Sequence, residues 1–187
     1  MIEGRITRIS GPIVYAEGLG SCGLYDVVDV GDARLIGEII RLNKDSATIQ
    51  VYEDDTGLKI GEKVVCNQRP LSLRLGPGLV GTIYDGIQRP LKSMFEDAGA
   101  FLLPGQRTEP LDSQKKWKFE PYLSVGDAIY PGCFVGSVEE TSSICHKIMV
   151  PPTLKGKTIK TIVPAGEYTI DDVVATTDLD EEICLSQ

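Results

Sequence analysis

Ser72-Leu-Arg-Leu-Gly-Pro-Gly-Leu-Val-Gly-Thr-Ile-Tyr-Asp-Gly-Ile-Gln-Arg-Pro-Leu91 lies between two halves of the chain that are both rich in short apolar segments. Gly76-Pro77-Gly78 is expected to end the preceding strand, because proline donates no N–H and glycine tolerates positive φ. Leu79, Ile83 and Ile87 recur at four-residue spacing. That spacing fits either a short amphipathic helix or successive turns.

Two further pairs punctuate the same stretch. Asp85-Gly86 indicates a turn or the end of a helix, and Arg89-Pro90 requires an extended residue before the proline. Taken alone, these residues predict a linker with a helical turn. A second helical turn is expected between Arg89 and Ala98, with Leu91, Met94 and Phe95 on one side, followed by a loop rich in Gly and Pro to Pro110.

The first 72 residues predict a small β-barrel. Residues 2–9 alternate apolar and polar side chains, as a half-buried strand does. Further short strands are expected at residues 13–16, 25–30, 35–42, 47–52 and 64–66, with turn residues between them. Strands this short bury little as an open sheet, whereas closure into a barrel removes the edges and fills the centre.

The second half predicts another β-rich domain. Strands are expected at residues 134–138, 144–150 and 156–163. Lys115-Lys116-Trp117-Lys118-Phe119 alternates basic and aromatic residues, a pattern that can bind single-stranded nucleic acid. On a strand, however, the two aromatic residues would share a buried face and leave the lysines in water. The tail from Asp171 to Gln187 contains six acidic residues before Ile183 and is expected to be a strand with a loose end, or partly disordered.

Composition narrows the class of protein. The chain has 187 residues, a net charge of −8 and a pI near 4.7, which argues against a general nucleic-acid surface. The acidic excess falls in residues 93–187, which hold 15 acidic and 8 basic residues. No apolar stretch approaches the length of a membrane span, and the start of the chain has no apolar signal core. Five scattered cysteines without a C-x-x-C pair predict reduced thiols in a cytosolic protein.

The sequence contains only weak matches to known catalytic, nucleotide-binding and metal-binding motifs. Gly156-Lys157-Thr158 ends like a phosphate-binding loop, but Pro151 stands where the first glycine is needed and a strand is expected where a helix is required. Cys145-His146 is not a nucleophile–base pair, because neighbours on a strand point to opposite faces. His146 is the one histidine, which removes most zinc arrangements. No catalytic, cofactor-binding or metal-binding residue is therefore assigned.

The acidic pairs of the chain are interpreted as solvated turns. These pairs are Asp54-Asp55, Glu139-Glu140, Asp171-Asp172 and Glu181-Glu182. The order of Gly-Asp, Gly-x-Val, Pro-Pro and Gly-x-Ile in residues 121–170 resembles the barrel-sandwich arrangement of biotinyl and lipoyl carrier domains. Those carriers display a lysine at a hairpin tip, and the corresponding tip here, residues 139–143, has none. Cofactor attachment is therefore not expected.

Several segments together resemble the catalytic A subunit of V-type and archaeal A-type rotary ATPases. The match includes Leu75-Gly-Pro-Gly-Leu79 running into Ile83-Tyr-Asp-Gly-Ile-Gln-Arg-Pro-Leu91. Residues 5–12, 36–42 and 47–53 are similar to its barrel strands, whereas Asp54-Asp55-Thr56 departs from the family's usual pattern. Residues 146–152 and 164–170 are similar to the bulge insertion of A subunits.

The resemblance implies a division into a barrel at 1–72, a linker at 73–112 leading toward a nucleotide-binding domain, and a bulge domain at 113–187. It implies that the phosphate loop, the catalytic groups, ATP and Mg²⁺ belong to a part of the family's subunit beyond Gln187. This portion is then expected to be catalytically silent. Its partners would be neighbouring A and B subunits of the head ring and, through the bulge, a peripheral stalk or regulator, on the cytoplasmic side of a membrane without inserting into it.

Two alternatives from other classes stay open. One is a stand-alone barrel or carrier-like adaptor without catalysis, and the other is a cysteine-dependent enzyme, which would show one thiol of abnormal reactivity. The residues do not indicate whether the coupling ion would be H⁺ or Na⁺, whether synthesis or hydrolysis dominates, or which oligomer this portion forms.

Overall fold

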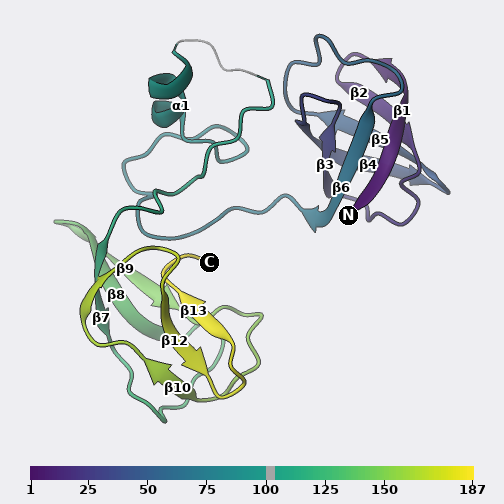
Figure 1. The fold of residues 1–187 in the computed structure, drawn as a ribbon. Helices are drawn as coiled ribbons and strands as arrows, with labels where there is room; N and C mark the ends of the chain where they lie inside the picture. The colour runs from purple at the N-terminus through teal and green to yellow at the C-terminus, as the bar shows by residue number, and fades with distance from the viewer. Residues whose placement is uncertain (100–103) are drawn as a thin grey trace. The chain divides into compact units, whose positions relative to one another are not determined.

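The computed structural model describes residues 1–99 and 104–187, which form two compact units (Figure 1). The first unit contains Met1–Ser72 and Met94–Arg107, and the second contains Leu73–Ser93 and Thr108–Gln187. The segment expected as a linker, residues 73–112, therefore divides between the two units. Residues 100–103 of the expected Gly- and Pro-rich loop lie outside the described part of the chain.

The first unit is a closed six-stranded antiparallel barrel (Figure 1). Its strand order around the barrel is β1-β2-β5-β4-β3-β6. The strands are β1 (Ile2–Ser10), β2 (Ile13–Glu17), β3 (Asp26–Val30), β4 (Leu35–Asn43), β5 (Ser46–Val51) and β6 (Lys63–Pro70). The predicted barrel is confirmed, and pairing of β1 with both β2 and β6 leaves neither terminal strand with a free edge.

Alternating side chains build the barrel core. Val14 and Ala16 of β2 point inward with no exposed surface, and Ile49 of β5, paired with Val14, is equally buried. The core consists mainly of aliphatic residues, with two thiols, Cys22 and Cys66, among them. Small branched side chains fill the narrow interior of a barrel of this size.

The short segment Pro104–Arg107 packs on this barrel within the same unit. The backbone N–H of Gly105 donates to Glu53 Oε2 (2.8 Å), while Glu53 Oε1 accepts the N–H of Ile36 (3.0 Å). Arg107 forms an ion pair with Asp29. One carboxylate thus joins β4 to a segment more than 50 residues further along the chain.

Residues 72–91, the organising stretch, form turns that lead into one helix. Helix α1 covers Leu91–Ala98, as expected, with Met94 fully buried. Phe95 is 61% exposed, so the expectation that it shares a face with Met94 is wrong. The reason is geometric, because consecutive residues lie about 100° apart around a helix. Before the helix, turns lie at residues 77–78, 80–81 and 86–87, and a bridge between Tyr84 and Pro90 closes the last of them.

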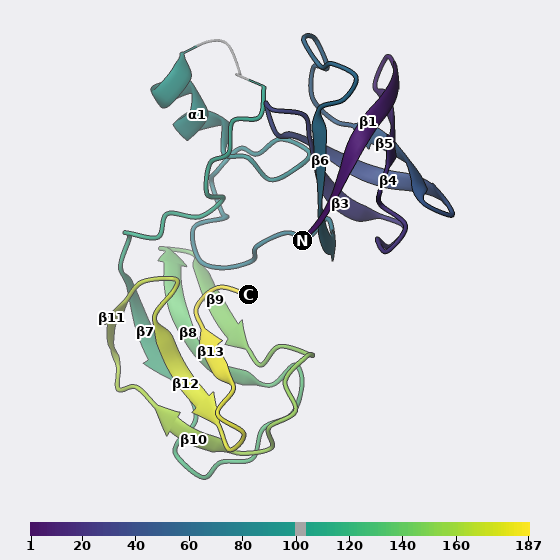
Figure 2. The ribbon, with the colours of Figure 1, turned by 45° about the vertical axis from the view of Figure 1, so that its right-hand side comes forward.

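The second unit is a sandwich of two antiparallel sheets (Figure 2). The four-stranded sheet has the order β11-β7-β8-β9, and the three-stranded sheet has the order β10-β12-β13. Their bounds are β7 (Trp117–Pro121), β8 (Phe134–Thr141), β9 (Ile144–Met149), β10 (Ile159–Ile162), β11 (Gly166–Tyr168), β12 (Val173–Thr177) and β13 (Glu182–Cys184).

Both sheets contribute to one core in the second unit. Trp117 and Phe119 share the inner face of β7 and are 5% and 0% exposed, which confirms the buried-strand interpretation of these aromatics. Val174 and Ile183 belong to the same core and come from the acidic tail. The tail thus forms two strands rather than a partly disordered end, because the apolar residues of β12 and β13 bury in the core while the acids lie mainly before and between these strands.

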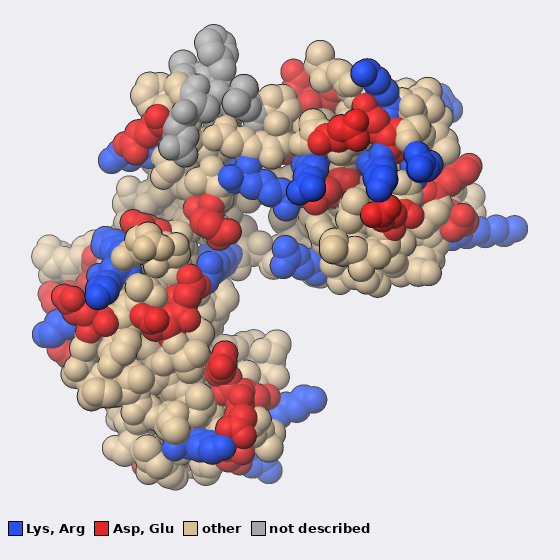
Figure 3. Space-filling view, in the orientation of Figure 1, with Lys and Arg blue, Asp and Glu red and all other residues tan. Residues whose placement is uncertain are grey.

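Charges of both signs mix on the surface of each unit. On the face drawn in Figure 3, Lys and Arg side chains lie among Asp and Glu side chains over the barrel and over the sandwich. Exposed pairs include Lys63 with Glu3 (3.2 Å) and Lys118 with Glu120 (3.1 Å). Pairs this exposed contribute little to stability, about 0–1 kcal/mol each.

Candidate functional site

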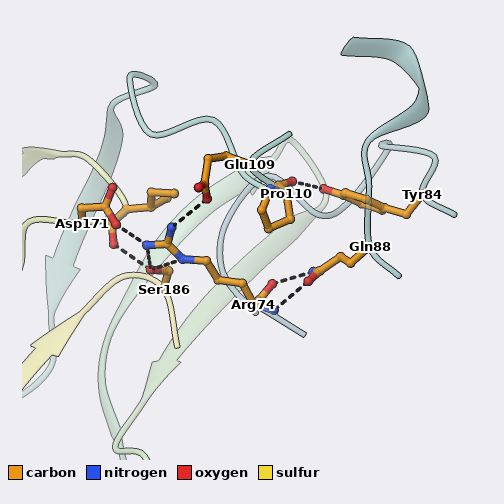
Figure 4. Close-up of polar contacts among 8 residues, drawn as sticks. Arg74, Tyr84, Gln88, Glu109, Pro110, Asp171 and Ser186 are labelled. Atoms are coloured by element: carbon orange, nitrogen blue, oxygen red, sulfur yellow. Dashed lines mark hydrogen bonds and ion pairs between the residues drawn. The ribbon is translucent and has the colours of Figure 1, made fainter. Parts of the chain in front are cut away.

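Arg74, near the start of the organising stretch, ties it to the end of the sandwich (Figure 4). The guanidinium forms an ion pair with Asp171 and donates from Nη2 (2.8 Å) and Nε (3.2 Å) to Ser186 Oγ. Its Nη1 lies 3.7 Å from Glu109 Oε2. A planar guanidinium presents several donors at fixed angles, so one side chain orients three partners.

The backbone of the same residue is held by an amide side chain (Figure 4). Gln88 Oε1 accepts the N–H of Arg74 (2.7 Å), and Gln88 Nε2 donates to the Arg74 carbonyl (2.7 Å). Nearby, the Tyr84 hydroxyl donates to the Pro110 carbonyl (2.8 Å). The amide therefore pairs with the backbone as a neighbouring strand would, and it fixes the distance between the two ends of the stretch.

The turn between these anchors is closed by a carboxylate. Asp85 accepts the backbone N–H groups of Ile87 (3.1 Å) and Arg89 (2.8 Å), and its Oδ2 accepts from Arg89 Nε (2.7 Å). Burial raises the pKa of Asp85, but the hydrogen bonds and charge of Arg89 outweigh burial and leave the pKa below its ordinary value. Asp85-Gly86 is thus the turn predicted from the sequence, and Arg89 closes it.

Gly76-Pro77-Gly78 does not end a strand as expected, because β6 already ends at Pro70; the three residues instead run past the β8–β9 hairpin. The N–H of Gly78 donates to Glu140 Oε1 (2.7 Å), and the N–H of Val80 donates to the same oxygen (3.0 Å). Gly78 has φ +106°, and a Cβ at this position would lie 3.3 Å from Trp117 Cζ2. Glycine is therefore suited here both by its backbone angle and by the close approach to the indole ring.

The Gly156-Lys157-Thr158 loop cannot cradle a phosphate in this fold, because carboxylates of the chain occupy its amides. Glu181 Oε2 accepts the N–H groups of Lys155 (3.0 Å) and Gly156 (2.8 Å). Asp178 Oδ1 accepts the N–H groups of Lys157 (2.8 Å) and Thr158 (3.4 Å). The N–H groups of Gly156 and Lys155 lower the pKa of Glu181, so the loop amides stabilise the charged form of this carboxylate.

The acidic pairs are therefore not simply solvated turns. Glu140 has a 2% exposed side chain, Glu181 binds loop amides and Asp171 pairs with Arg74. The prediction was wrong for Glu140, which is buried, and it missed the partners of Glu181 and Asp171, which are backbone N–H groups and a guanidinium from distant parts of the chain. Each pair contributes at least one acid to internal contacts except Asp54-Asp55, where Asp54 accepts the N–H of Thr56 within its own turn (3.0 Å).

Cys145 and His146 face different surroundings. Cys145 is exposed and borders a hollow of about 310 Å³ on the sheet surface beside Lys118 and Glu139. His146 Nδ1 instead lies 3.2 Å from Glu140 Oε2. The imidazole of His146 therefore contacts the Glu140 carboxylate and not the thiol of Cys145. Within the described residues, no group of three or more His, Cys, Asp or Glu side chains is arranged to hold a metal ion.

Thiol labelling tests the cysteine-dependent alternative. With a water-soluble aromatic disulfide reagent in excess, we expect the exposed Cys145 to react first, at a rate no greater than that of free cysteine. Burial raises the pKa of the Cys22 thiol to about 12 and leaves little thiolate to react, so Cys22 and the fully buried Cys66 should react only on unfolding. Cys145→Ser should remove the first phase. A fast phase that survives this substitution would revive the enzyme hypothesis.

Comparison with known proteins defines the class. The family model for the ATP synthase alpha/beta family, beta-barrel domain, matches residues 6–67, and the model for the ATP synthase alpha/beta subunit barrel-sandwich domain matches residues 108–187. The chain belongs to the ATP synthase alpha/beta family. Within the family it is a homologue of the A subunits of the A-type and V-type enzymes, as its sequence resemblance indicated.

Three relatives show the extent of the match. The A subunit of the A-type ATP synthase of Thermoplasma volcanium is 51% identical over 173 residues, which is 92% of this chain and 22% of the relative. That of Methanosphaera stadtmanae is 45% identical over 98% of this chain and 31% of the relative. The V-type ATP synthase alpha chain of Clostridium botulinum is 50% identical over 94% and 29%, respectively. The chain thus spans about a fifth to a third of these relatives.

In the parts of the chain that the structure describes, no helix has both the length and the apolar character needed to cross a bilayer.

Proposed function

We propose that this chain is the barrel and barrel-sandwich portion of the catalytic A subunit of an A/V-type ATPase. The observation that carries the proposal is the succession of two family domains, barrel first and sandwich second, in a chain about 50% identical to A-type and V-type relatives. The complete subunit would couple ATP hydrolysis or synthesis to ion movement across a membrane. It would work at the cytoplasmic surface as part of an assembled complex.

This portion would serve assembly rather than chemistry. Its one sequence resembling the end of a phosphate loop has its backbone amides bound to Glu181 and Asp178, so these amides are not available to a nucleotide. ATP and Mg²⁺ would bind another part of the subunit. The barrel would contact neighbouring A and B subunits, and the sandwich would contact a peripheral stalk or regulator, neither of which requires nucleic acid or insertion into a bilayer.

Native immunoprecipitation from the source cells tests the proposal. An antibody raised against this chain should capture a polypeptide far larger than 20.3 kDa, together with ATP hydrolysis activity. Titration calorimetry of the isolated 187-residue chain with Mg-ATP should show no binding. A captured protein of 20.3 kDa without ATPase activity would support the stand-alone adaptor instead, and binding of Mg-ATP by the isolated chain would contradict catalytic silence.

The sandwich's role can be tested separately. In a reconstituted complex, deletion of residues 113–187 from the full subunit should weaken stalk binding while barrel contacts in the head ring persist. A complex that lacks the sandwich but still binds its stalk normally would contradict the second half of the proposal.

A further inference from the structure

A buried carboxylate at the β8–β9 hairpin holds the Gly76–Val80 segment. Glu140 has a side chain only 2% exposed, and its Oε1 accepts the N–H groups of Gly78 (2.7 Å) and Val80 (3.0 Å). Oε2 lies 3.2 Å from His146 Nδ1. A buried carboxylate is costly unless several donors compensate for the lost water. Here two backbone N–H groups donate to the carboxylate, and a histidine nitrogen lies within hydrogen-bonding distance of its other oxygen.

A β-bulge explains why this side chain points toward the segment. The register of β8 on β9 shifts between Glu139 and Thr141, so Glu140 is the extra residue in the ladder. A bulge turns one side chain away from the regular alternation. Glu139, its neighbour, pairs with Cys145 in the regular ladder and is exposed. The two glutamates therefore have different surroundings although they are adjacent.

The segment covers the one tryptophan of the chain. Gly78 lies against the Trp117 ring, and Trp117 is only 5% exposed. The Trp117 indole Nε1 is buried without a hydrogen-bond partner. Among the described residues, the hydrogen bonds that join residues 76–82 to the rest of the second unit both end on Glu140. Displacement of the segment would therefore expose the indole and give its N–H a water partner.

We propose that Glu140 is a latch for a two-state element of the second unit. In the docked state, the carboxylate binds the Gly78 and Val80 amides and the segment covers Trp117. In the released state, both amides and the indole are exposed to water. This inference depends only on contacts within the second unit and is independent of the proposed role in an ATPase.

Amide hydrogen exchange of the whole 187-residue chain tests the latch. Glu140→Ala should accelerate exchange at Gly78 and Val80 about tenfold or more, because each amide loses a hydrogen bond to a charged acceptor, which is stronger than one to a neutral acceptor. Emission of Trp117 should shift to longer wavelength. The Leu75 amide, which donates to the Gln187 carbonyl (2.8 Å), should change less than twofold, and this shows that the unit is still folded.

Two further variants complete the test. Glu139→Ala removes the adjacent exposed glutamate and should leave all three amides as in the unaltered chain. Glu140→Gln keeps the shape and one acceptor oxygen without the charge, so exchange at Gly78 and Val80 should be intermediate, and this variant replaces Glu140→Ala if the latter does not fold. Unchanged exchange at Gly78 and Val80 in the Glu140 variants, or equal acceleration at Leu75, would overturn the proposal.

Discussion

Phe119→Ala is expected to lower the free energy of unfolding of the second unit by about 3–5 kcal/mol, the usual cost of removing a buried aromatic side chain. Phe119 has no exposed surface, and its ring meets Tyr168 edge-on at 6.2 Å between centroids. Its other side is filled by the backbone of Gly136, where a Cβ would lie 2.4 Å from Phe119 Cε2. Because strand backbone forms this wall, the cavity would not readily collapse.

The loss should be confined to one unit. Denaturation followed by Trp117 fluorescence reports the second unit, while amide exchange at Val14 and Ile49 reports the barrel core. Phe95→Ala is the matched control, because it makes the same chemical change at a side chain that is 61% exposed. A loss below about 1 kcal/mol for Phe119→Ala, or a similar loss for Phe95→Ala, would contradict the assignment of Phe119 to the core.

The architecture of the barrel followed from local pattern. Ile6, Val14 and Ile49 are apolar residues within alternating segments, and alternation specifies which face of a strand is buried. Closure followed from the shortness of the strands. The same reasoning placed Trp117 and Phe119 on one buried face, because residues two apart on a strand point to the same face of any sheet. Local periodicity was therefore sufficient to predict which side chains of a strand face the core.

The contacts of the organising stretch could not be predicted in this way. Glu140 reaches Gly78 over 62 residues, and Arg74 reaches Asp171 over 97. A β-bulge turns the Glu140 side chain toward the Gly78 and Val80 amides, and the pattern of a single sequence does not reveal where a bulge occurs. The acidic pairs were assigned to solvent because an isolated acid is most often solvated. Glu140 and Glu181 instead bind backbone N–H groups, which have no signature in the side-chain sequence, and Asp171 pairs with a guanidinium 97 residues away.

The assignment of segments to units depends on similarly distant contacts. Residues 104–107 were predicted to be part of a Gly- and Pro-rich loop. The Gly and Pro content of a segment indicates how freely its backbone can turn, but it does not indicate whether the segment packs on a neighbouring domain. In the fold, Glu53 accepts the Gly105 N–H and Asp29 pairs with Arg107, and both acids belong to the barrel. In both units, carboxylates therefore bind backbone N–H groups of an irregular segment that has no ladder partner.

Gly105→Ala is expected to release this segment from the barrel. A Cβ at Gly105 would lie 1.8 Å from the carbonyl oxygen of Ala33, a distance at which backbone must move. The residue also has φ +71°, a conformation that costs a residue with a side chain about 1–2 kcal/mol. Since about 1.4 kcal/mol is a factor of ten in population, trypsin cleavage after Arg107 should accelerate about tenfold or more. Timed digestion with mass analysis measures this rate.

Gly61→Ala separates the clash from the backbone angle. Gly61 belongs to the same unit, has φ +92° and has nothing within 4 Å of the added Cβ. Its variant should carry the conformational cost alone and leave cleavage after Arg107 unchanged. The two variants therefore differ in whether the Glu53–Gly105 hydrogen bond can form, since only Gly105→Ala forces that amide away from its carboxylate. Equal cleavage of Gly105→Ala and the unaltered chain would mean that this hydrogen bond and the Asp29–Arg107 pair do not hold the segment.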